Sequence, residues 1–105
     1  MPPLGPRDHH ITLAQAIQFT ARHRQMATAA ATINAGAFLR DQVLELLNQA
    51  GCAGIRIYLG RDNNGATNYV AVGVDANGDD MTQGTILEVM WPCPPMCPPS
   101  SALNA

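Results

Sequence analysis

The fold of this chain is decided by residues 55–74, which read IRIYLGRDNNGATNYVAVGV. Apolar and polar side chains alternate from Ile55 to Leu59, and this period of two is typical of a half-buried β-strand. The loop at residues 61–65 contains Asn and Gly, which accept the positive φ angles of tight hairpin turns. Residues 67–74 alternate again. We therefore predict an antiparallel hairpin with strands near 54–60 and 67–74.

A second turn and a third strand follow this hairpin. Residues 75–80 read DANGDD and begin like a calcium-binding loop, but the glycine comes at the fourth position and Ile86 stands where the twelfth ligand, a glutamate, is required. A turn is therefore the better interpretation. Alternation resumes from Thr85 to Trp91, which predicts a third strand near 85–91 and a three-stranded antiparallel meander.

Two helices are predicted before the sheet. Thr12 and Gln15 have the spacing of a capping box, and a helical period continues to Met26. Residues 39–50 carry an apolar stripe, and the glycine after them is the expected left-handed terminator, Gly51. The alanine-rich run between the helices either extends the first helix or forms a connector. The predicted fold class is α+β, with two helices packed on one face of the meander (ααβββ).

Prolines dominate both ends of the chain. Residues 91–101 read WPCPPMCPPSS, and each proline fixes its own φ and disfavours helix for the residue before it. This composition predicts a stiff rod of polyproline-II geometry. We expect an irregular N-terminal arm at 1–10, a single α+β domain at 11–91, and an extended Cys/Pro-rich tail at 92–105.

The composition limits the classes of partner. Charged residues make up only 13% of the 105 residues, against about 25% in typical domains, which leaves room for subunit contacts. The net charge is −2 and all six cations are arginines, so neither nucleic acid nor an anionic membrane is an expected partner. Without an apolar leader segment, we expect a cytoplasmic location by default, and extracellular export by a non-classical route stays compatible with the sequence.

Three cysteines cannot pair fully within one chain. Three free thiols are one interpretation, and a disulfide from Cys52 to the tail is another. In a meander, Cys52 and Cys93 start at opposite ends of strands that are roughly 20 Å long, so they are too far apart to bond. Cys97, further along the tail, is then the expected partner of Cys52, and Cys93 is the expected free or intersubunit thiol.

Metal and catalytic chemistry are not expected. The spacing of Cys93 and Cys97 does not fit a zinc knuckle, and a fourth ligand would have to come from His9, His10 or His23. The sequence shows no acid–base pair, nucleophile arrangement or phosphate loop. We therefore predict a protein that is not an enzyme and that holds no metal and no cofactor.

Self-association would resolve two problems of this layout. Two helices cover one face of the sheet, and three strands leave two edges unpaired. We expect the other face, with both tyrosines, to be uncovered. The candidate interface residues are Tyr58, Tyr69, Ala71, Ala30, Cys93, Pro94 and Pro95.

Three segments resemble a family of small uncharacterised bacterial proteins that end in Cys-Pro-Pro-x-Cys-Pro-Pro. These segments are residues 11–17, 50–58 and 93–99. The resemblance implies that the three cysteines act together, and it implies no activity. Our first hypothesis is a structural or protein-interaction subunit that self-associates, as a homo-oligomer, an open assembly or a filament. The second is a thiol- or metal-dependent accessory protein that uses Cys52, Cys93 and Cys97.

Overall fold

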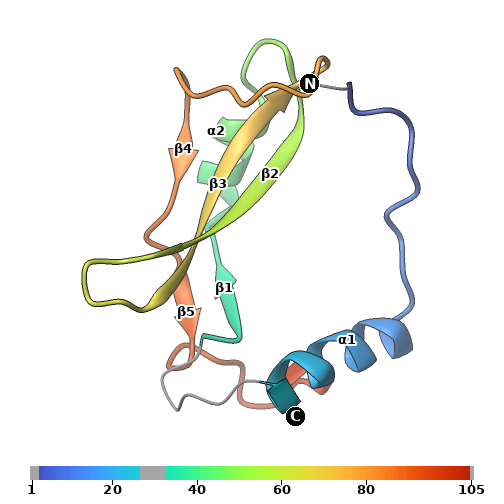
Figure 1. Ribbon diagram of the computed structural model, residues 1–105, viewed down its shortest axis with the longest axis vertical. Coiled ribbons are helices and arrows are strands. Elements are labelled where there is room, and N and C mark those ends of the chain that lie inside the picture. Colours follow the sequence, from blue (N-terminus) through green and yellow to red (C-terminus); the bar gives the residue numbers. More distant parts are fainter. Residues whose placement is uncertain (1–2, 27–32, 105) are drawn as a thin grey trace.

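The computed structural model describes residues 3–26 and 33–104 and confirms an α+β fold (Figure 1). Strands β2, β3 and β4 form a three-stranded antiparallel sheet, and β1 pairs with β5 in a separate two-stranded sheet. The elements in chain order are α1 (Leu13–Met26), β1 (Ala35–Ala37), α2 (Arg40–Leu47), β2 (Cys52–Arg61), β3 (Thr67–Asp75), β4 (Ile86–Leu87), β5 (Trp91–Cys93) and the 3-10 helix η1 (Ala102–Asn104).

The predicted hairpin is formed by β2 and β3. Their register runs from Arg61 opposite Thr67 to Cys52 opposite Asp75, with one irregularity next to Cys52. Asp62 closes the turn, because its Oδ1 accepts hydrogen bonds from the backbone N–H groups of Asn64 and Ala66, both at 2.9 Å. Local residue chemistry therefore determines this part of the fold, as the sequence indicates.

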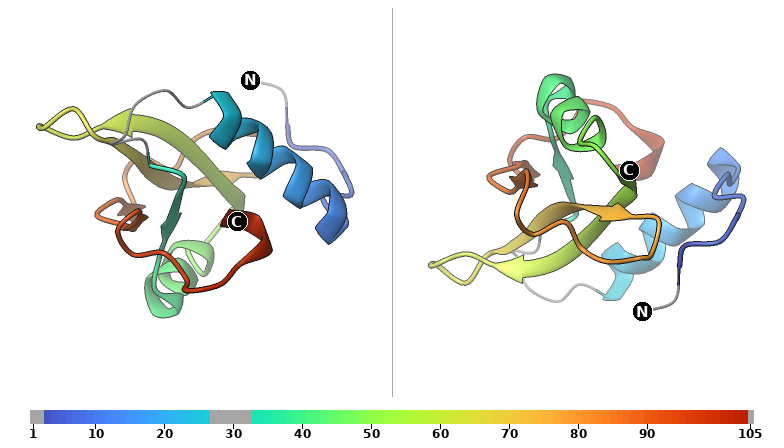
Figure 2. Two further views of the ribbon diagram at one scale, coloured as in Figure 1. Left: turned by 90° about the horizontal axis from the view of Figure 1, so that it is seen from below. Right: turned by 90° about the horizontal axis from the view of Figure 1, so that it is seen from above.

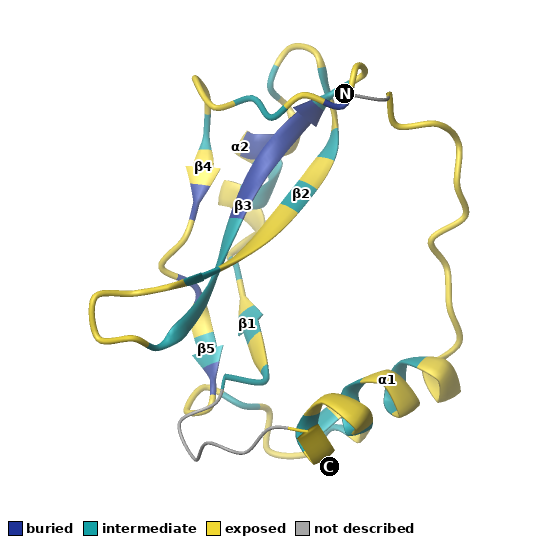
Figure 3. Ribbon diagram, in the orientation of Figure 1, coloured by how far each residue is buried: buried dark blue, intermediate teal, exposed yellow. Residues whose placement is uncertain are grey.

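The core lies between α2 and the sheet (Figure 1, Figure 3). Leu46 is fully buried and packs against Ala71 of β3 and Leu87 of β4. Gln49, just after the helix, donates to the Leu46 carbonyl (2.7 Å) and accepts from the backbone N–H of Thr85 (2.9 Å). Gly51 has the expected positive φ, 83°, but it does not end the helix as predicted, because α2 stops at Leu47 with Asn48 as its C-cap and Gly51 belongs to the turn that leads into β2. The helix is thus held to the sheet by apolar packing and by one bridging amide.

The residues predicted to share the uncovered face of the sheet do not lie on one face. Tyr58 pairs with Val70, whereas Ala71 pairs with Ile57 and Leu87, so Tyr58 and Ala71 lie on opposite faces. Ala71 is only 1% exposed and belongs to the core beneath α2. It is therefore not available as an interface residue. The sequence predicts the hairpin but not the exact length of its loop, and a difference of one residue in that length changes which side chains of the two strands share a face.

Only one of the two helices packs on the sheet. The capping box of α1 is confirmed, since Thr12 N–H donates to Gln15 Oε1 (2.9 Å) and Gln15 N–H donates to Thr12 Oγ1 (3.1 Å). However, none of its residues is buried, and α1 lies against η1 near the C-terminus instead of on the sheet (Figures 1 and 2). Its half-buried residues include only one large apolar side chain, and the others are small or polar: Ala16, Ile17, Thr20, Ala21 and Arg24. Within residues 3–26 and 33–104, neither α1 nor α2 is long and apolar enough to cross a bilayer.

The predicted order of two helices followed by three strands is not confirmed, because the third strand is short and two further strands are present. β4 has only two residues, and Val89 shortly after it has a φ of 49°, a conformation that a β-branched residue rarely adopts. The chain then leaves the sheet, and residues 91–93 pair with residues 35–37 of the alanine-rich connector. The domain boundary expected at residues 91 and 92 therefore falls inside β5.

The tail is not a straight rod. After β5 the chain turns back, and Met96 N–H donates to the Pro92 carbonyl at 2.7 Å. The Cα atoms of Cys93 and Cys97 are 4.7 Å apart, whereas four residues of polyproline-II helix would span about 12 Å. The Cys93–Pro94 and Pro94–Pro95 peptide bonds are both cis. Pro94 and Pro95 form the exposed part of this turn.

Candidate functional site

The outer edge of β2 is the most exposed regular element of the sheet. In the strand order β2-β3-β4, β2 is an edge strand of ten residues, and no strand in the described part of the chain pairs with its outer side. Figure 3 shows β2 largely as an exposed ribbon beside the buried β3. A long, unpaired edge presents backbone donors and acceptors on which another chain can pair.

The alternation of hydrogen bonds identifies which residues of β2 carry these free groups. Asp62 N–H donates to the Ala66 carbonyl at 2.9 Å, and neighbouring residues of a strand point their backbone groups to opposite sides. The even-numbered residues of β2 therefore direct their N–H and C=O toward β3, as Asp62 does. The odd-numbered residues, Ile57 among them, direct theirs away from β3. Gly73, which is opposite Ile55, fits this pattern, because its carbonyl accepts from Met81 N–H (2.8 Å) on the side away from β2.

The same odd-numbered residues expose apolar side chains. Ile55 is 42% exposed, Ile57 is 55% exposed and Leu59 is 76% exposed. They lie on the α2 face of the sheet, but α2 covers the sheet around Ala71 and Leu87 and leaves this outer row open. Free backbone groups and an open apolar row thus coincide at one edge.

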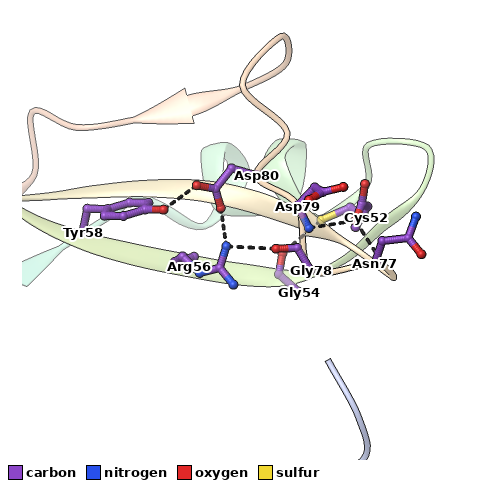
Figure 4. A network of polar contacts seen from close by, with 9 residues as sticks. Cys52, Gly54, Arg56, Tyr58, Asn77, Gly78, Asp79 and Asp80 are labelled. Carbon is purple, nitrogen blue, oxygen red and sulfur yellow. Dashed lines mark hydrogen bonds and ion pairs between the residues drawn. The ribbon is translucent and has the colours of Figure 1, made fainter. Parts of the chain in front are cut away.

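A polar cluster occupies the opposite face of β2 (Figure 4). Arg56 Nη1 forms an ion pair with Asp80 Oδ1 at 2.5 Å and also donates to the Gly78 carbonyl at 3.2 Å. The Tyr58 hydroxyl donates to the second carboxylate oxygen, Asp80 Oδ2. The aspartate therefore joins two side chains that stand two residues apart on β2.

These bonds shift the pKa values of all three groups. The hydrogen bond from Tyr58, together with the guanidinium of Arg56, lowers the pKa of Asp80 below its usual value. The same hydrogen bond raises the pKa of Tyr58, and the ion pair raises the pKa of Arg56. At neutral pH the cluster is therefore a carboxylate held by one cation and one neutral phenol.

The turn after β3 positions Asp80. Asp75 Oδ1 accepts hydrogen bonds from the backbone N–H groups of Asn77 (2.9 Å) and Asp79 (3.0 Å), and Gly78 has a φ of 86°. Asp80 then forms an isolated bridge with Val74, which brings its carboxylate over β2. The DANGDD segment is a turn, as predicted. The sequence does not connect Asp80 with Arg56; the available signal was an acidic residue directly after a turn that returns the chain to the strand.

A cavity of about 880 Å³ lies between the N-terminal arm and the first half of β2. The arm contributes Leu4, Arg7 and His9, and the strand contributes residues 53–57. Residues 3–12 form neither helix nor strand, so the arm lines this space without adding a strand to the sheet.

The cysteines pair differently from the prediction. Cys93 and Cys97 form a disulfide, and Cys52 is a free thiol whose Sγ lies 3.2 Å from the Gly54 carbonyl. The predicted Cys52–Cys97 bond is therefore wrong, and so is a free Cys93, because the tail turns back on itself within four residues. The three cysteines are not brought together. In residues 3–26 and 33–104, no group of three His, Cys, Asp or Glu side chains could hold a metal ion.

The other predicted interface residues are scattered. Tyr58 is exposed beside the free edge, and Tyr69 is half-buried, with its ring next to Gly36. Cys93 is only 4% exposed. Ala30 lies outside the described residues. The apolar row Ile55, Ile57 and Leu59 was not among the predicted interface residues, because its alternation also fits a strand face covered by a helix.

No protein-family profile, curated protein or solved structure matches this chain.

Proposed function

We propose that this chain is a non-enzymatic structural or protein-interaction subunit that self-associates through the free edge of β2. The observation that carries the proposal is the coincidence of outward backbone groups and exposed apolar side chains along one edge strand, namely Ile55, Ile57 and Leu59. A sheet edge of this kind, with no proline and no lysine among residues 53–61, has few of the features that keep edges apart.

Composition supports the same proposal. A chain with 13% charged residues has fewer charges than a typical monomer uses to stay dispersed. The partner in this proposal is another copy of the chain, and neither nucleic acid nor a membrane takes part.

The proposal is tested by the mass of the purified protein in solution, measured by light scattering over a range of concentrations. We expect a mass well above the 11.2 kDa of one chain. Leu59→Lys should shift the distribution toward the monomer, because a charge on the exposed edge opposes pairing. Met26→Lys is the matched control, since Met26 is also highly exposed, at 81%, but lies on α1. A wild-type protein that stays monomeric at high concentration would refute the proposal.

A further inference from the structure

The middle of β2 is nearly symmetric about Ile57. Moving outward in either direction, the chain has first a long polar or aromatic side chain, then an aliphatic one, then glycine: Arg56, Ile55 and Gly54 on one side, and Tyr58, Leu59 and Gly60 on the other. This segment, Gly54 to Gly60, lies within the part of β2 that pairs regularly with β3, which runs from Gly54 to Arg61.

We propose that two copies of the chain pair β2 against β2 in antiparallel orientation, with a twofold axis passing beside Ile57. This inference rests on the proposed function and adds the partner, the register and the closure of the assembly. Two three-stranded sheets then become one continuous sheet. Since each copy uses its single long edge, the product is a closed dimer and not a filament.

The backbone fits this register. Ile57 directs its N–H and C=O outward, so it can exchange both hydrogen bonds with Ile57 of the second copy. Ile55 and Leu59 have the same parity and stand opposite each other across the axis. An axis beside Arg56 would also let outward backbone groups pair, Ile55 with Ile57 of the second copy, so the backbone alone does not choose between these two registers and the side chains decide.

The side chains fit it as well. The exposed row of each copy continues into the row of the other, with Ile55 beside Leu59 and Ile57 beside its own copy, so apolar surface is buried without a partner of another kind. Gly54 stands opposite Gly60.

The charges favour this register over the one with the axis beside Arg56. Arg56 faces Tyr58 of the second copy in the non-hydrogen-bonded pairs, where side chains are closest. That tyrosine is bonded to the carboxylate of its own Asp80, so each guanidinium approaches a phenol and an acid. The two Arg56 side chains do not stand opposite each other, whereas an axis beside residue 56 would bring these like charges together.

Cysteine cross-linking tests the register. In a Cys52→Ser background, Ile57→Cys places two thiols in directly opposite positions, about 5.5 Å apart at Cα, which is within the range for a disulfide. Ile55→Cys and Leu59→Cys are matched controls, because each alone lies four residues along the strand from its own copy, roughly 14 Å away. Mixing those two variants should produce a cross-linked heterodimer, and this pair leaves Ile57 in place if its replacement weakens association.

We expect mild oxidation to convert Ile57→Cys to covalent dimer at least tenfold faster than either control alone, and the mixture to cross-link similarly. If the protein self-associates by mass but neither Ile57→Cys nor the mixture exceeds the single controls, the β2 register is wrong and the proposed function stands. Equal cross-linking of all three single variants would indicate parallel strands and also overturn the register. A wild-type monomer would overturn both.

Discussion

Tyr58 on β2 and Asp80, twenty-two residues later in the chain, are joined by a hydrogen bond from the phenol to the carboxylate. Arg56 approaches the same carboxylate from the position two residues before Tyr58. This contact connects the hairpin with the turn that follows it, at a place where no regular strand pairing continues beyond the bridge at Val74.

The hydrogen bond should make Tyr58 a weaker acid in the folded protein. Its pKa is raised above 10.0, so the bond contributes stability that is fully present below pH 10.0 and is lost as the pH rises through the folded-state pKa. Asp80→Asn should return the pKa of Tyr58 toward its usual value. The absorbance of tyrosinate, followed in a Tyr69→Phe background so that only Tyr58 titrates, measures the change. An unchanged titration in Asp80→Asn would show that the bond does not form in solution.

Acidification should weaken the same cluster by protonating Asp80. The pKa of Asp80 is lowered below 3.8, so its carboxylate contributes stability above about pH 3.8 that is lost as the pH falls through the folded-state pKa. The difference in unfolding free energy between the wild type and Asp80→Asn should therefore narrow below that pH. Chemical denaturation at several pH values measures it, and a difference independent of pH would contradict an ionised Asp80.

Leu46 should be the most sensitive position of the core. It is fully buried against β3 and β4, so Leu46→Ala should lower the unfolding free energy by about 2–5 kcal/mol through lost burial and the cavity left behind. Leu39→Ala, at a residue that is 59% exposed beside the same helix, should change it by only about 0.5 kcal/mol. Equal effects in the two variants would mean that α2 does not pack on the sheet as described.

Thiol counting should distinguish the observed disulfide from the predicted one. Without reductant, one cysteine per chain, Cys52, should react with an alkylating reagent in denaturant, and all three should react after reduction. Peptide mapping should find Cys93 linked to Cys97. Replacing both by serine should lower the unfolding free energy by about 2 kcal/mol, because the disulfide closes a short loop in the unfolded chain. If Cys52 does not react with the alkylating reagent before reduction, Cys52 is itself in a disulfide, as predicted from the sequence.

The sequence predicts those parts of the fold that local chemistry determines. The capping box at Thr12, the Asp62 turn and the turn at Asp75 all depend on residues within about five positions of each other. The pairing of Ala35 with Cys93 joins positions fifty-eight residues apart, and nothing in either short segment identifies its partner. The candidate site, too, is predictable from the sequence only in its local features. Alternation along β2 is visible in the sequence, but the exposure of Ile57 depends on where α2 comes to lie.

The two-stranded sheet β1–β5 also governs how the chain responds to tension. Ala35 begins β1 and stands opposite Cys93, which ends β5, so a force pulling on the two chain termini enters the pair at one and the same end. The hydrogen bonds between the two strands are then stretched one after another, beginning with the bond from Asn34 N–H to the Cys93 carbonyl. Because the bonds break singly and not all at once, the two strands separate from that end at low force.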